Sequence, residues 1–125
     1  MEKRMYWLVS TVYEMPDIQE NMDGKRIMVD LVRALEKRLK VKIKYFAEEK
    51  DGTWLYLIET GGVLGIYARE RFEVKGHFVK EPSAMNFKKA LTAALKTAGS
   101  KEMADEMHSS IVVVETGING EVELY

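Results

Sequence analysis

The chain of 125 residues contains no cysteine. Disulfides, thiolate nucleophiles and zinc or iron–sulfur sites built on cysteine are therefore excluded. Lys and Arg number 19 against 20 Asp and Glu, so the formal net charge is −1 and bulk electrostatics give no general attraction to nucleic acid or anionic membrane. The sequence also lacks a secretory h-region and a run long enough to span a bilayer. We therefore expect a cytoplasmic protein that binds neither membrane nor nucleic acid.

The sequence also lacks the motifs of several enzyme classes. It has no Gly-rich phosphate loop, no nucleophile elbow and no His-Glu-x-x-His. Gln occurs once and Asn three times against many Lys and Glu, a composition typical of thermophiles, although eight Met residues count against that interpretation. The length fits one compact domain, residues 1–125.

The spacing of apolar residues predicts the elements of this domain. Ile27, Leu31 and Leu35 recur at every fourth position and indicate a helix over residues 23–39. A second helical stripe follows Pro82-Ser83, the expected stop and N-cap, and ends before Gly99. Residues 101–107 are read as a short helical turn or an irregular segment. Strands are predicted over residues 5–14, 41–46, 54–59, 63–69, 72–79, 111–116 and 121–125. Residues 41–46 and 72–79 alternate between apolar and polar side chains, and the Asp51-Gly52 and Gly61-Gly62 turns mark the strands beside them.

Two parts of the chain share one pattern. In each, a helix is followed by an apolar strand, a Glu-Thr-Gly turn (Glu59-Thr60-Gly61 and Glu115-Thr116-Gly117) and a second strand that closes on Tyr. The order of elements predicts an α+β fold of duplicated βαβββ-type modules, with a pseudo-repeat of residues 1–69 and 70–125. We expect a curved, mostly antiparallel sheet with the two main helices on its outer face.

Three stretches give the chain a resemblance to a known superfamily. Gly76-His77-Phe78-Val79 before the second helix, Asn119 to Tyr125 at the end, and residues 35–69 are similar to the corresponding parts of the vicinal oxygen chelate superfamily. That superfamily includes glyoxalase I, bleomycin-resistance-type proteins and extradiol dioxygenases. The resemblance implies sheets that curl around a ligand cavity, and a homodimer in which two chains complete the pocket.

The resemblance also implies a divalent metal in some members. His77 and Glu123 match two of the metal-ligand positions. The first strand offers Tyr6 and Trp7 where a His is expected, and Gly65 stands where some members carry a carboxylate. A catalytic metal normally takes three protein ligands and an open position, so the set is incomplete. Whether the protein is an enzyme is left open.

Alternation along the strands assigns side chains to the two faces of the sheet. The apolar sets, such as Phe72 and Val74, are expected to meet the helices. The polar sets then share the far face, either as a solvated surface or as the lining of a pocket. For the pocket, the expected ligand-binding residues are Tyr67, His77, Glu123 and Tyr125, with Trp7 and Trp54 as aromatic walls.

Three functions are compatible with these observations. The first is small-molecule binding of glyoxalase or bleomycin-resistance type, in a pocket on the concave face of the sheet. The second is a metal-dependent lyase, isomerase or dioxygenase, in which the ion polarises vicinal oxygens of the substrate. The third is a non-enzymatic protein–protein interaction module that uses the open sheet face. A ligand on the side of Tyr67, His77 and Glu123 would favour the first two.

Overall fold

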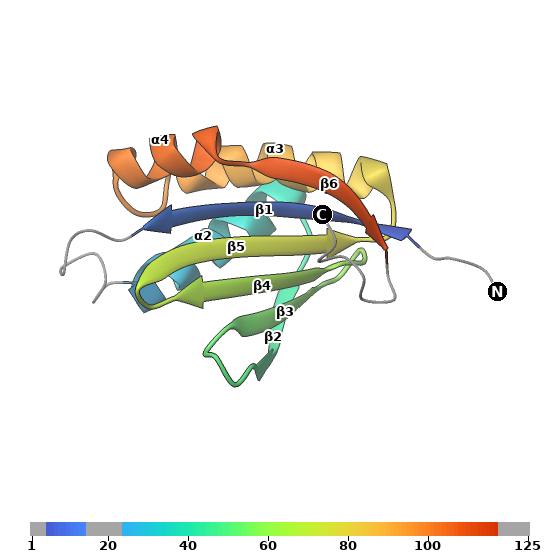
Figure 1. Ribbon diagram of the computed structural model, residues 1–125, viewed down its shortest axis with the longest axis horizontal. Coiled ribbons are helices and arrows are strands. Elements are labelled where there is room, and N and C mark those ends of the chain that lie inside the picture. The colour runs from blue at the N-terminus through green and yellow to red at the C-terminus, as the bar shows by residue number, and fades with distance from the viewer. Residues whose placement is uncertain (1–4, 15–23, 118–125) are drawn as a thin grey trace.

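The computed structural model of the chain describes residues 5–14 and 24–117 (Figure 1). The predicted last strand, with Glu123 and Tyr125, lies outside the described residues. The described elements are β1 (Met5–Glu14), α2 (Gly24–Leu39), β2 (Ile43–Glu48), β3 (Trp54–Ile58), β4 (Val63–Ala68), β5 (Arg71–Phe78), α3 (Glu81–Leu95), α4 (Lys101–Ser109) and β6 (Val112–Gly117).

The six strands form one antiparallel sheet in the order β2-β3-β4-β5-β1-β6. Four of them, in the spatial order β6-β1-β5-β4, follow the path of a split βαβ fold, in which β1-α2-β4 and β5-α3-β6 are related units. The hairpin β2–β3 is inserted between α2 and β4 and extends the sheet at one edge. The described part of the second half has no counterpart of this hairpin.

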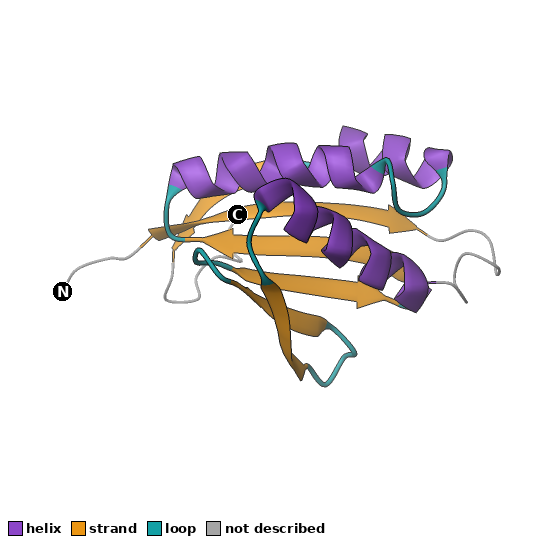
Figure 2. Cartoon of the chain, turned by 180° about the vertical axis from the view of Figure 1, so that it is seen from behind, coloured by secondary structure: helices purple, strands orange, loops and turns teal. Residues whose placement is uncertain are grey.

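The predicted fold class is confirmed as α+β, since the described residues form three helices and a curved, open antiparallel sheet. Figure 2 shows α2 and α3 lying across the same face of this sheet. The two βαβ units of the described residues have the same topology. The pseudo-repeat of residues 1–69 and 70–125 stays a prediction. No helix in the described part of the chain is both long and apolar enough to cross a membrane.

The core lies between the sheet and the helices. Leu31 and Leu35 of α2 and Phe87 and Leu91 of α3 are fully buried or nearly so, as the fourfold spacing predicts. Along β5, Phe72 and its alternate neighbours face these helices. The sheet residues that share the core with the helices are Val9, Tyr13, Tyr56, Ile58, Leu64, Ile66, Phe72, Val74 and Phe78.

Two predictions at helix ends need correction. The helix α3 begins at Glu81 with Lys80 as N-cap, so the predicted N-cap Ser83 is wrong. Pro82 is tolerated in the first turn because its missing N–H would have no intrahelical partner there. Residues 101–109 form the regular helix α4, because the Ser100 hydroxyl caps it by accepting the Met103 N–H at 3.1 Å.

The hairpin β2–β3 bends away from the plane of the other strands (Figure 1). The register between these two strands shifts between Tyr45 and Ala47, and such a bulge increases the local twist. This bend brings the tip of the hairpin toward the sheet face that the helices leave uncovered.

Candidate functional site

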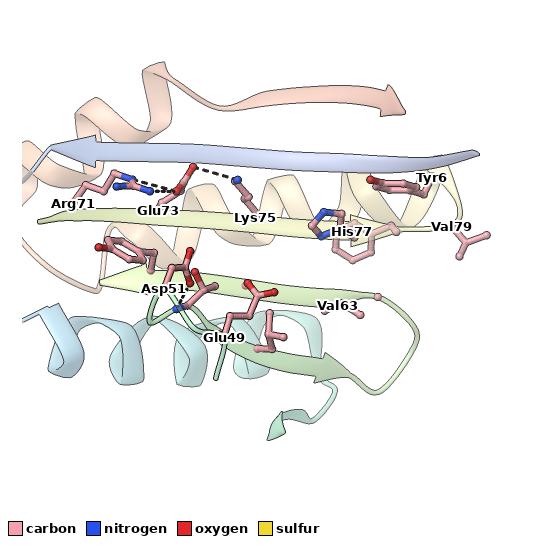
Figure 3. Close-up of a pocket in the computed structure, with 15 residues that line it drawn as sticks. Tyr6, Glu49, Asp51, Val63, Arg71, Glu73, Lys75, His77 and Val79 are labelled. Atoms are coloured by element: carbon pink, nitrogen blue, oxygen red, sulfur yellow. Dashed lines mark hydrogen bonds and ion pairs between the residues drawn. The ribbon is translucent and has the colours of Figure 1, made fainter. Parts of the chain in front are cut away.

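A cavity of about 600 Å³ lies on the open face of the sheet, opposite α2 and α3 (Figure 3). Its floor is formed by β4 and β5, one side by Tyr6 of β1, and the other by the start of β3 and the turn before it. The lining residues are Tyr6, Glu49, Asp51, Thr53, Leu55, Gly62, Val63, Gly65, Tyr67, Arg71, Glu73, Lys75, His77, Phe78 and Val79.

The strand register explains why most of these side chains meet. Tyr67 pairs with Glu73, Gly65 with Lys75, and Val63 with His77 across β4 and β5. Side chains directly opposite each other in an antiparallel pair point to the same face. The alternation that sends Phe72 and Val74 into the core therefore sends Glu73, Lys75 and His77 to the opposite face, as predicted from the sequence, and there they line the cavity.

Gly65 makes the floor of the cavity hollow. It is buried in β4, and a Cβ atom there would approach no neighbour closer than 3.4 Å, the distance to Thr53 Cγ2. A residue with a side chain would therefore fit the backbone and project into the open space. The absence of a side chain at this position accounts for part of the cavity's depth.

The β2–β3 turn carries the acidic wall of the cavity. The carboxylate of Asp51 accepts the Thr53 N–H at 2.9 Å, and the Glu49 N–H donates to the Thr53 carbonyl at 2.8 Å. Gly52 adopts φ +100°, and a Cβ atom on it would lie 2.7 Å from Nε of Arg69. The positive φ favours glycine at this position, and its lack of a side chain lets the Arg69 guanidinium lie close to the turn.

Hydrogen bonds from Thr53 lower the pKa of Asp51, first from its backbone and then from its side chain. Arg71 lowers it further by its charge. Hydrogen bonds to the carboxylate stabilise its charged form, so Asp51 is ionised at neutral pH. The turn therefore presents a fixed negative charge toward the cavity.

A row of charged side chains runs along β5, across the cavity from the β2–β3 turn. Glu73 lies between two cations, with Arg71 Nη2 at 3.2 Å and Lys75 Nζ at 3.6 Å from its carboxylate oxygens. The Arg71 guanidinium also lies over the Tyr67 ring, 4.4 Å from its centroid. The Tyr67 hydroxyl in turn donates a short hydrogen bond to Glu70, which raises the pKa of Tyr67 and lowers that of Glu70.

His77 lies at the apolar end of the cavity. Its ring is 5.3 Å from the Tyr6 ring, between centroids, and it neighbours Val63 on β4. Burial lowers the pKa of His77, and the charge of Lys75 lowers it further. A hydrogen bond to the Val63 backbone and the charge of Glu49 act in the opposite direction. Because its pKa lies below the ordinary 6.5, His77 is mainly neutral at pH 7, and its ring can donate one hydrogen bond and accept another.

The structure brings together two of the six residues predicted to bind a ligand. Tyr67 and His77 both line the cavity. Trp7 and Trp54 pack on the opposite face of the sheet, against the core. There Trp54 borders a second cavity of about 230 Å³, and Nζ of Lys25 lies 4.7 Å from the Trp54 ring centroid. Glu123 and Tyr125 lie outside the described residues.

The predicted metal ligands do not form a set within the described structure. No group of three or more His, Asp or Glu side chains in residues 5–14 and 24–117 is arranged to hold a metal ion. The carboxylate predicted to join His77 is Glu123, outside these ranges. The His, Asp and Glu side chains of the described residues therefore do not fit a catalytic metal.

The sequence did not point to the acidic wall. Glu49, Asp51 and Thr53 belong to a segment that the Asp51-Gly52 turn signal identifies only as a hairpin loop. Its position over the sheet depends on the bulge in β2 and on the packing of Arg69 against Gly52.

The arrangement supports binding more directly than any particular reaction. The cavity combines an apolar end at Tyr6, Val63 and His77 with charged groups at its other end, and its single histidine is neutral. Comparison of the chain with models of protein families gives no match, and comparison with curated protein sequences gives none.

Proposed function

We propose that this protein binds a small organic molecule in the cavity on the open face of its sheet. The observation that carries the proposal is the cavity itself, whose volume of about 600 Å³ lies within the range of small-molecule sites. The proposal rests on this cavity rather than on the resemblance to the vicinal oxygen chelate superfamily.

The two ends of the cavity have different roles in this proposal. Tyr6 and Val63 supply apolar area, and burial of an apolar group there contributes about 25 cal/mol per Å² of surface removed from water. The charged groups on the β2–β3 turn and on β5 orient the ligand. Arg71 and Glu73 are held by their mutual ion pair, so these side chains need little reordering when a ligand arrives.

A substitution at Gly65 tests the proposal. Gly65→Phe places a ring in the cavity, and its Cβ atom meets only ordinary van der Waals contacts. The matched control is Val112→Phe, which adds a ring to β6 on the same sheet face, at a position 53% exposed and outside the cavity lining. Native mass spectrometry of the three proteins, purified identically, measures any co-purified ligand. We expect wild type and Val112→Phe to retain it and Gly65→Phe to lose it.

Two results would contradict this proposal. One is a ligand retained equally by all three proteins, which would place it elsewhere on the chain. The other is a wild-type protein that carries no ligand and binds none from a library of small organic molecules at millimolar concentration. Circular dichroism and thermal melting confirm that Gly65→Phe is folded before its binding is compared.

Self-association through the open face is a second candidate function. The register places Leu57, Val63, His77, Leu8 and Val114 in one row across five strands. Leu57 is 49% exposed and Val114 is 43% exposed, so the row presents apolar surface to solvent. A second copy of this chain, related by a two-fold axis, would cover the row with an identical one.

Sedimentation equilibrium distinguishes this second function. If the open face pairs two chains, wild type has the mass of a dimer and Val114→Glu has that of a monomer. Val29→Glu is the control, because Val29 is 37% exposed on α2 and lies away from this face. A wild-type monomer at high protein concentration would exclude the homodimer.

A further inference from the structure

The charges that line the cavity are unequally compensated. Three carboxylates and two cations face the space: Glu49, Asp51 and Glu73 against Arg71 and Lys75. Both cations are engaged by the same acid, because Glu73 holds Arg71 at 3.2 Å and Lys75 at 3.6 Å. Both cations of the cavity are therefore already paired with Glu73, on the same strand.

Glu49 and Asp51, on the β2–β3 turn, are not paired with a cation of the described residues in this way. Neither Glu49 nor Asp51 forms a salt bridge within residues 5–14 and 24–117. The Asp51 carboxylate is hydrogen-bonded by the backbone N–H and the side chain of Thr53, both of which are neutral. Figure 3 shows the Glu49 and Asp51 side chains across the cavity from β5. Arg71 acts on Asp51 only weakly, by its charge, so a group that enters between the β2–β3 turn and β5 meets two carboxylates that no cation of the described residues contacts.

The rest of the cavity is suited to an uncharged body. Tyr6 and His77 form a pair of rings at one end, with centroids 5.3 Å apart, and Val63 extends that end with apolar surface. An aromatic or aliphatic group fits this end, while a charged group of the same ligand would meet the acids of the β2–β3 turn.

We infer that the ligand of this cavity is an organic cation, a protonated amine attached to an aromatic or aliphatic body. The ammonium lies against Glu49 and Asp51, and the body occupies the end formed by Tyr6, Val63 and His77. This assignment rests on the proposed binding function and specifies its ligand class. Free carboxylates and phosphates are excluded from the same position by the two acids.

Three matched probes test the sign of the charge. 2-Phenylethylamine, 2-phenylethanol and 3-phenylpropionate share a phenylethyl body and differ in bearing a positive, a zero or a negative charge at neutral pH. Titration of ¹⁵N-labelled protein, followed through the backbone amides of Gly65 and Lys75, gives the affinity of each. We expect the amine to bind about tenfold more tightly than the alcohol, since a close charge pair that stays open to water supplies a factor of roughly this order. The carboxylate should bind most weakly.

A pair of variants tests the residues. Glu49→Gln combined with Asp51→Asn should reduce amine affinity about tenfold and leave alcohol affinity unchanged, because only the charge is removed. Glu48→Gln is the control, since Glu48 borders the second cavity, on the other face of the sheet. It should bind the amine as wild type does.

The outcomes separate the ligand class from the binding function. If the alcohol or the carboxylate binds as tightly as the amine or more tightly, with shifts at Gly65 and Lys75, the cationic assignment is overturned. The same shifts would still support binding of small molecules in the cavity. Amine binding that survives the double substitution would also overturn the assignment. If none of the three probes shifts these amides at millimolar concentration, the cationic assignment fails, and the search for a co-purified or library ligand then decides the proposed function separately.

Discussion

Adding a single methyl group at Gly76 should destabilise the protein. Gly76 lies on the core-facing side of β5, and a Cβ atom there would be 2.8 Å from Cε2 of Phe78 and 2.9 Å from Cε2 of Phe87. These two rings are in contact, with centroids 5.0 Å apart, and both are almost completely buried. Neither ring can move aside without disturbing the packing between β5 and α3.

The size of the effect follows from two opposing contributions. Inserting a methyl group into a packed core costs about 1–3 kcal/mol. Replacing Gly by Ala also restricts the unfolded chain, which offsets about 0.4–1 kcal/mol of that cost. We expect Gly76→Ala to lower the free energy of unfolding by about 1–2 kcal/mol. For a domain of this length that corresponds to a fall in Tm of roughly 4–8 °C.

Gly65→Ala is the matched control for this prediction. Gly65 lies on the adjacent strand β4, and a Cβ atom there meets nothing closer than 3.4 Å. The same change of residue should therefore be neutral or stabilise by about 0.4–1 kcal/mol, because only the effect on the unfolded chain remains. Urea unfolding followed by circular dichroism measures both variants. Gly76→Ala as stable as Gly65→Ala would refute the packing between β5 and α3, whereas partial recovery in Gly76→Ala with Phe78→Leu would support it.

Two further substitutions give separate tests. Thr11 is 3% exposed and its hydroxyl donates to the Met107 carbonyl at 2.6 Å, so Thr11→Val should lower the free energy of unfolding by about 1 kcal/mol in the same urea assay. His77 has a folded-state pKa below its ordinary value of 6.5, so the folded state binds fewer protons than the unfolded state. Stability should therefore fall as pH is lowered from 6.5 toward the folded pKa, and His77→Gln should weaken that dependence.

Each of these two tests has a clear contrary result. A Thr11→Val protein that is as stable as wild type would show that the hydroxyl does not tie β1 to α4. For His77, an NMR titration of the ring gives the pKa directly. A midpoint above 6.5 would contradict the burial of the ring beside Lys75.

The faces of β4 and β5 could be predicted because their alternation is strong. Phe72 and Val74 are apolar while Glu73 and Lys75 are charged, so only one assignment leaves the charges in water. The helix α2 was predictable for a related reason, since Leu31 and Leu35 repeat with the helical period. These patterns were sufficient to place Tyr67 and His77 on one face.

The positions of the two tryptophans could not be predicted in this way. In β1, Trp7 and Val9 alternate with Tyr6 and Leu8, and both sets are apolar. In β3, Trp54 and Tyr56 alternate with Leu55 and Leu57 in the same manner. Where both faces of a strand are apolar, the alternation does not indicate which one meets the helices.

The acidic wall depends on tertiary geometry. Glu49 and Asp51 reach the cavity because the hairpin bends at the bulge between Tyr45 and Ala47 and because its tip packs on Arg69. A bulge of one residue leaves little trace in the sequence, and the contact of Gly52 with Arg69 joins residues 17 positions apart in number.

The most direct measurement is an experimental electron-density map of wild-type crystals grown without added ligand. The space between the β2–β3 tip and the middle of β5 should be open or hold non-protein density, with the Glu49 and Lys75 side chains on opposite sides. A hairpin folded down onto the sheet, with these two side chains joined and no space between them, would contradict the binding role.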